Sequence, residues 1–253
     1  MTTDATASPP ESPARRRLRQ RLHEIRDGYG LTLLLTIATI ACIALTGFGS
    51  VGGIIEVVLA GATLLFALNT SRANPRVMRV AQAFVGISLA VAVIAQLSGD
   101  SKLGDFSIAA IGLAIAAIVP VVILLNIVRS PEITYRLVIG ALVIYLLIGL
   151  CYAYGFAVIA LATGQPFFVQ TANANSSTFL YFSYVTLSTV GYGDYSAALP
   201  IGQLTSVSEA IFGQLYLVSI VAILVANVGR SFRDVKDRDP KVRDAEDRDT
   251  SSG

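Results

Sequence analysis

The sequence predicts an all-α membrane protein built on six transmembrane helices. The chain has 253 residues, of which 54% are hydrophobic and only 14% are charged. A soluble domain carries about 25% charged residues. The charges concentrate near the two ends and in a few short loops, and long uncharged runs lie between them. Because a helix satisfies its own backbone polar groups in lipid, apolar runs of this length predict membrane-spanning helices.

Six apolar runs give the positions of these helices. A helix crosses the hydrocarbon core with about 20 residues, within a range of roughly 17 to 25. The second run is short by this measure, although Gly52 or Gly53 can extend it, and Pro120 in the fourth run predicts a kink. The expected helices are residues 31–48, 54–69, 77–97, 106–128, 137–162 and 201–228.

The charges of the connecting segments predict the orientation. Arginines occur before the first helix, in the second and fourth loops, and after the sixth helix. The third loop is mixed in charge, and residues 163–200 carry a single charge, Asp194. The positive-inside rule therefore places both termini in the cytoplasm and residues 163–200 outside.

The two terminal segments lie outside the predicted helices. Residues 1–14 are rich in Pro, Ser, Thr and Ala, which predicts disorder. Arg15–Arg26 has apolar residues at helical spacing, so it is either a basic amphipathic helix on anionic lipid or a disordered basic tail. Residues 230–253 alternate basic and acidic side chains without a heptad pattern, which predicts a solvated tail.

Between the fifth and sixth helices the sequence predicts a helix too short to cross the membrane. Gly164 and Pro166 are expected to end the fifth helix, and Ser176 or Ser177 can cap the next one. That helix covers about residues 178–187 and should therefore enter the membrane only partway. Its C-terminal end carries partial negative charge, which favours a cation near the bilayer centre.

The short helix leads into the string TVGYGD, which is Thr189, Val190, Gly191, Tyr192, Gly193 and Asp194. This string resembles the selectivity filter of the potassium channel superfamily, and the resemblance covers residues 137–228. It implies a re-entrant pore helix and a filter loop whose carbonyls, from Thr189 to Tyr192, replace the hydration shell of potassium. The alternating glycines agree with this, because successive carbonyls on one side require dihedrals that glycine tolerates.

The resemblance also implies contacts that hold the filter in place. Asp194 stands at the outer mouth, where a side-chain hydrogen bond would support the filter and the charge would attract cations. The Tyr192 side chain is expected to point away from the ion and to bond into an aromatic cuff formed by Tyr181, Phe182 and Tyr184.

Two residues of the sixth helix each allow two interpretations. Glu209 either supports the filter from behind, against Ser183 or Thr186, or faces water near the outer surface. Gly213 is either a gating hinge or a glycine that permits close helix packing. Many relatives have an acidic residue in the short helix, where this chain has Val185 and Thr186. The usual carboxylate clamp behind the filter is therefore either missing or rebuilt.

The first four helices resemble those of voltage-gated relatives in number and placement only. No Lys or Arg lies between Lys102 and Arg129, whereas steep voltage gating needs several charges in the fourth helix. Glu56 is the one charged residue within the second predicted helix, near its outer end, where an interfacial and a functional role are equally plausible.

The sequence therefore predicts a potassium-selective channel of the bacterial six-transmembrane type. It would conduct passively in the plasma membrane as a homotetramer, without enzymatic activity, nucleic-acid partner or cofactor other than permeant K⁺. Two alternatives are a potassium-uptake or secondary transporter subunit, which the single filter without an internal repeat disfavours, and a non-conducting modulatory membrane protein. The expected domains are a cytoplasmic segment, a sensor-like domain without arginines, a pore domain and a charged tail, at residues 1–28, 29–130, 131–229 and 230–253.

Overall fold

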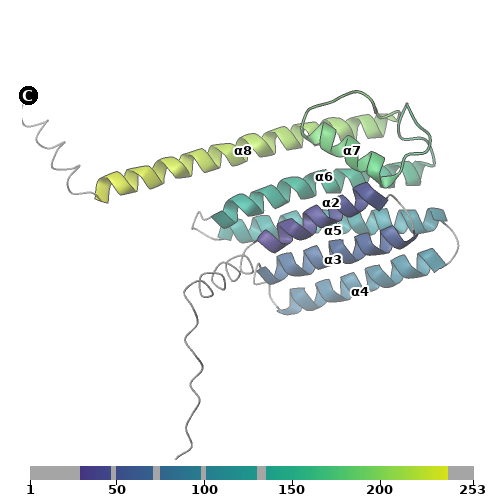
Figure 1. Cartoon of the computed structure of the whole chain (residues 1–253), viewed down its shortest axis with the longest axis horizontal. Coiled ribbons are helices and arrows are strands. Elements are labelled where there is room, and N and C mark those ends of the chain that lie inside the picture. The colour runs from purple at the N-terminus through teal and green to yellow at the C-terminus, as the bar shows by residue number, and fades with distance from the viewer. Residues whose placement is uncertain (1–28, 47–49, 71–74, 98–100, 130–134, 239–253) are drawn as a thin grey trace, which may run out of the picture.

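The computed structural model describes residues 29–46, 50–70, 75–97, 101–129 and 135–238. The segment Arg15–Arg26 and the tail beyond residue 238 lie outside these described residues. Seven helices make up the regular structure of the described part (Figure 1): α2 (Gly30–Thr46), α3 (Ser50–Thr70), α4 (Pro75–Leu97), α5 (Ser101–Arg129), α6 (Tyr135–Thr163), α7 (Ser176–Leu187) and α8 (Pro200–Arg238).

The described helices establish a multi-pass, all-α membrane protein. Five of them, α3, α4, α5, α6 and α8, are long and apolar enough to cross a bilayer. Helix α2 is also apolar, but it is shorter at 17 residues. Each of the six apolar runs therefore forms a helix close to its expected position. The glycines Gly52 and Gly53 do extend the second helix, and α5 continues through Pro120 without a break.

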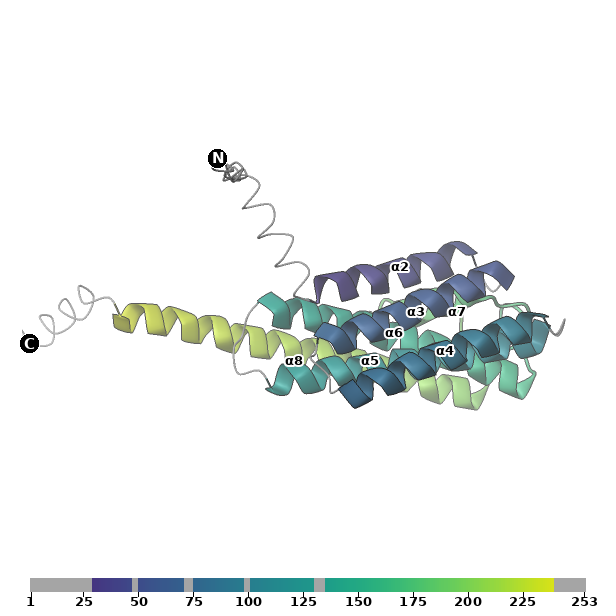
Figure 2. The same cartoon turned by 90° about the horizontal axis from the view of Figure 1, so that it is seen from below.

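Helices α2 to α6 form a bundle whose members lie side by side along the long axis of the molecule (Figures 1 and 2). The most extensive packing joins α5 to α6, which connects the first four helices to the rest of the chain. A core of buried aliphatic side chains fills this junction, including Leu64 of α3, Val119 and Ile123 of α5, and Val143 of α6.

The short helix α7 lies at one end of the bundle, where it contacts α2, α6 and α8 (Figure 1). Helix α8 packs against α6 and α7 near its start and then extends beyond the bundle. The described part of α8 continues to Arg238, past the end expected at residue 228.

Candidate functional site

Helix α7 is too short to cross a membrane. It has 12 residues, which corresponds to a length of about 18 Å, whereas the hydrocarbon core is about 30 Å thick. The capping residue is Asn175, not Ser176 or Ser177: its Oδ1 accepts hydrogen bonds from the Thr178 backbone N–H at 2.9 Å and hydroxyl at 2.8 Å. An asparagine just before the helix can accept from the N3 amide, which the first serine inside the helix cannot do in that geometry.

The backbone after α7 folds back onto the end of that helix. The Thr189 N–H donates to the Thr186 carbonyl at 2.9 Å, and the N–H groups of Val190 and Gly191 donate to the Val185 carbonyl at 3.0 and 3.3 Å. These bonds satisfy carbonyls that the helix end leaves without a partner. The described chain has no cis peptide bond, and in a trans peptide the carbonyl points opposite to the N–H. The carbonyls of Thr189 and Val190 therefore point away from α7, on the same side.

The dihedral angles alternate along this segment. Thr189, Gly191 and Gly193 have φ values of 57°, 54° and 79°, in the left-handed region, and no positive φ occurs at the residues between them. This alternation keeps successive carbonyls on one side. The glycines agree with the sequence-based expectation, whereas the left-handed Thr189 was not foreseen. A left-handed β-branched residue is strained, and here the hydrogen bond of its N–H to α7 holds it.

Asp194 joins the outer end of the segment to α7. Its Oδ2 accepts a hydrogen bond from the Tyr181 hydroxyl at 2.8 Å, and its Oδ1 accepts from the Tyr195 N–H at 3.1 Å. The hydrogen bond to Asp194 raises the pKa of Tyr181, because the carboxylate stabilises the protonated phenol. The loop is thus held at both ends by the same short helix.

The expected aromatic cuff does not form within one chain. The Tyr192 side chain is 71% exposed. The Tyr184 hydroxyl instead donates to the Leu146 carbonyl of α6 at 2.6 Å, and Phe182 packs into a different cluster. Of the three expected members, only Tyr181 meets the filter region, through Asp194.

The cluster that contains Phe182 is an aromatic core formed by residues of α6, α7 and the loop between them. Five phenylalanines pack at centroid distances of 4.9 to 6.2 Å, with several edge-to-face pairs: Phe156, Phe167, Phe168, Phe179 and Phe182. An antiparallel bridge joins the loop residues Phe168 and Ala197 beside it. The sequence does contain a signal for this cluster, the adjacent Phe167 and Phe168. Because both residues lie in a loop, they belong to no helical or strand periodicity that would have indicated their burial.

Glu209 is completely buried, so it does not face water. It is hydrogen-bonded to the Ser183 hydroxyl of α7, whose oxygen also lies 2.6 Å from the Gly149 carbonyl of α6. A serine hydroxyl has one hydrogen, and the Gly149 carbonyl can only accept. Ser183 therefore donates to Gly149 and accepts from Glu209, which requires a protonated carboxyl. The sequence indicated Ser183 and Thr186 as possible partners of Glu209, and in the structure Ser183 makes the hydrogen bond.

Gly213 lies against the last residue of α7. A Cβ at position 213 would come within 2.7 Å of both the carbonyl oxygen and the Cδ1 of Leu187. Gly149 of α6 approaches the same leucine, since a Cβ there would lie 3.1 Å from its Cδ2. Two glycines from different helices thus enclose Leu187, which is 1% exposed. This geometry supports the packing interpretation of Gly213, and α8 runs through this residue as a continuous helix.

Comparison with known proteins agrees with this location of the site. The model of a protein family described as "Ion channel" matches residues 146–230, which extend from the middle of α6 into α8. The matched region contains α7, the segment with alternating dihedrals, Glu209 and Gly213. No curated protein and no solved structure matches the chain. The C-terminal part of the chain thus carries an ion channel domain, and the matching family is one of channels, not of enzymes.

Proposed function

We propose that this protein is the subunit of a potassium-selective channel that conducts passively across the plasma membrane. The observation that carries the proposal is the alternation of left-handed residues at Thr189, Gly191 and Gly193, with the N–H groups at its start bonded to α7. This arrangement leaves a row of backbone carbonyls on the opposite side. The family match supports ion conduction, and the filter sequence supports the choice of potassium.

The chemistry follows from this row of oxygens. A potassium ion leaves water only if other oxygens replace its hydration shell, and carbonyls held at fixed positions can do so. The C-terminal end of α7 directs its partial negative charge to the same place. Asp194 adds a negative charge at the outer end, where it raises the local concentration of cations.

One chain supplies only one side of an ion path, so the proposal includes a homotetramer. Two side chains of the filter, Val190 and Tyr192, are 52% and 71% exposed in the single chain. Helix α8 is likewise uncovered over most of its apolar length, with exposed residues that include Leu204, Phe212 and Leu215. A helix with apolar residues on all sides is covered by other helices or by lipid. Neighbouring subunits around a central pore would cover both features.

The proposed orientation places both termini in the cytoplasm and the filter at the outer surface. It rests on the loop arginines and on an even number of crossings, with α2 as the first of six. The absence of Lys and Arg between Lys102 and Arg129 of α5 argues that membrane voltage does not move this helix.

Flux measurements in liposomes test the proposal. The purified full chain should release potassium from loaded liposomes, and sodium much more slowly. Gly191→Ala should abolish the selective flux, because alanine resists the left-handed conformation at φ 54°. Gly86→Ala is the matched control, since a Cβ at position 86 meets nothing within 4 Å.

Three results would contradict the proposal. Absence of potassium flux from the unmodified protein would favour a non-conducting membrane protein. Unchanged flux in Gly191→Ala would remove the filter from the ion path. Equal sodium and potassium fluxes would leave a channel but refute its selectivity.

A further inference from the structure

A second buried acid lies outside the segment that follows α7, in the core of the first four helices. Glu56 of α3 is 1% exposed, and neither of its carboxyl oxygens has a hydrogen-bond partner among the described residues. Burial of an ionised carboxylate without a partner is strongly unfavourable. An interfacial position is therefore inconsistent with the structure, and the burial requires another explanation.

The side chain that reaches Glu56 comes from α6. Tyr154 is 3% exposed, and its ring lies directly over Gly112 of α5, where a Cβ would approach the ring atoms to 2.5 Å. The absence of a side chain at Gly112 lets the tyrosine cross α5. The Tyr154 hydroxyl interacts with the Glu56 carboxyl without reaching hydrogen-bond geometry, and it makes no hydrogen bond to any other described residue.

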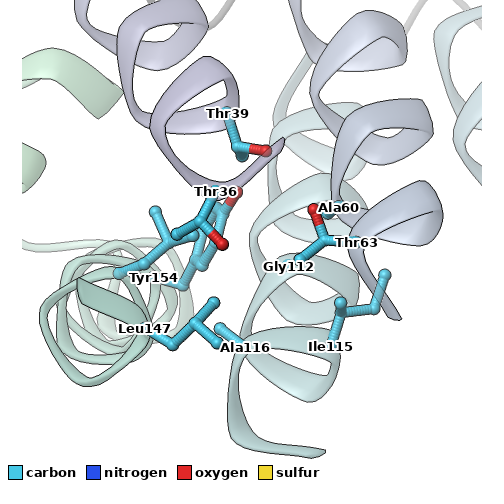
Figure 3. A pocket seen from close by; sticks show the side chains of 10 residues that line it. Thr36, Thr39, Ala60, Thr63, Gly112, Ile115, Ala116, Leu147 and Tyr154 are labelled. Atoms are coloured by element: carbon cyan, nitrogen blue, oxygen red, sulfur yellow. The ribbon is translucent and has the colours of Figure 1, made fainter. Parts of the chain in front are cut away.

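A small cavity beside the Tyr154 ring offers no competing donor. Its volume is about 10 Å³, and its lining includes Thr36, Thr39 and Thr63 (Figure 3). Each threonine hydroxyl already donates to the carbonyl four residues earlier in its own helix, at 2.8 to 2.9 Å. The hydrogens of the three threonine hydroxyls are therefore occupied, and this cavity supplies no donor to the Tyr154 hydroxyl or the Glu56 carboxyl in place of their contact with each other.

No described basic side chain is placed to neutralise a charge on Glu56. Arg76 and Arg79 lie in the first two turns of α4, which follow the far end of α3. Lys102 and Asp105 lie in the first turns of α5, before Gly112. The remaining ionisable groups described on the neighbouring elements are Cys42 of α2 and, on α6, Tyr145, Cys151, Tyr152 and Tyr154 itself.

We propose that Glu56 is a proton-binding site that links the first four helices to the pore domain through Tyr154. With the proton bound, the neutral carboxylic acid donates to the Tyr154 hydroxyl oxygen. Loss of the proton to water breaks the acid O–H bond and leaves a buried carboxylate beside Tyr154, which disfavours the packing of this side chain of α6 across Gly112 of α5. Proton binding stands independently of ion conduction, whereas its effect on flux rests on the proposed function.

The link to the filter follows from the other contacts of α6. The Gly149 and Leu146 carbonyls of this helix accept the hydrogen bonds of Ser183 and Tyr184 from α7. Tyr154 lies in the same helix, between one and two turns after Gly149. A displacement of α6 on deprotonation of Glu56 would therefore disturb the support of α7, and potassium flux should fall as the pH rises.

Infrared difference spectroscopy of the full chain in liposomes tests proton binding directly. The unmodified protein should show the C=O stretch of a protonated carboxyl that disappears on raising the pH, and Glu56→Gln should lack this band. Glu209→Gln should retain it, because that variant removes only the other buried acid. If Glu56→Gln fails to fold, Tyr154→Phe keeps the carboxyl and should shift the band. If Glu56→Gln and Tyr154→Phe both leave every protonated-acid band unchanged, the proton-binding site would be overturned.

The flux assay tests the coupling separately. Potassium flux through the unmodified protein should fall over the pH range in which the Glu56 band disappears, and Glu56→Gln should remove that component. Gly86→Ala should keep the full response. A band that titrates while flux stays constant would overturn the coupling alone. Absence of flux from every variant, with the band present, would contradict the proposed channel and leave the proton site intact.

Discussion

The contact between Gly213 and Leu187 yields a prediction that separates two roles for this glycine. In Gly213→Ala, the new methyl group would lie 2.7 Å from the Leu187 carbonyl oxygen and 2.7 Å from its Cδ1. The side-chain atom can rotate away. The carbonyl cannot, because it is part of the peptide that leads into the filter.

The magnitude follows from two opposing terms. Overpacking of this kind costs about 1–3 kcal/mol, and contact with a backbone atom favours the upper part of that range. Replacement of glycine by alanine inside a helix stabilises the folded state by about 1 kcal/mol. The expected net loss is therefore about 1–2 kcal/mol for each chain.

Gly155→Ala in α6 is the matched control, because a Cβ at position 155 meets nothing within 4 Å. This variant gains about 1 kcal/mol from helix propensity without the clash. The two variants should therefore differ by about 2–3 kcal/mol. Thermal unfolding of the detergent-solubilised protein measures this difference. Gly213→Ala should also reduce the ratio of potassium to sodium flux, because Leu187 is two residues before Thr189.

A different result would refute this reasoning. If Gly213→Ala unfolds at the same temperature as Gly155→Ala and keeps its ion selectivity, the packing interpretation is wrong. If, in addition, the fraction of time the pore is open changes, the hinge interpretation is correct.

Two further predictions concern the contacts around α7. Glu209→Gln should retain most of the stability, because an amide N–H can replace the acid as the donor to Ser183. Glu209→Leu should lose about 1–3 kcal/mol in thermal unfolding, because it removes that donor. Equal losses in the two variants would contradict the assignment of a protonated acid. Because Asp194 raises the pKa of Tyr181, the stabilising contribution of the phenol should persist below its unfolded pKa of about 10 and disappear as the pH rises through the higher folded value. Tyr181→Phe should remove this alkaline component of the pH–stability profile, and a profile identical to that of the unmodified protein would argue against the bond.

The helices and the filter segment could be predicted because their signals are local. Apolar run length places each helix, and the pair Gly191 and Gly193 indicates left-handed backbone in a short string. The strain at Thr189 could not be predicted, since its φ depends on a hydrogen bond back to Thr186. The phenylalanine cluster was missed for a related reason: Phe156 and Phe168 belong to a helix and a loop, and no periodicity connects them.

The sequence could not decide between a missing and a rebuilt carboxylate behind the filter. Val185 and Thr186 showed only that the acid is absent from α7. The structure places Glu209 of α8 behind the same helix, at Ser183. The third member of the contact, the Gly149 carbonyl, carries no sequence signal because every residue has a carbonyl. The protonation state of Glu209 depends on that third member, since without it Ser183 could donate to a carboxylate.

Helix α6 connects the first four helices to the helices that flank the filter segment. It packs against α2 and α5 on one side and against α7 and α8 on the other. Its carbonyls at Leu146 and Gly149 accept hydrogen bonds from α7, and its Tyr154 reaches into the first four helices. Glu56 meets this helix through Tyr154, and Glu209 meets it through Ser183 and the Gly149 carbonyl. Among the described residues, no basic side chain pairs with either acid. A change in the charge of either acid would therefore act on the same helix, and we expect the Glu56→Gln and Glu209→Gln substitutions to be non-additive in thermal unfolding, because α6 is a partner that both acids share.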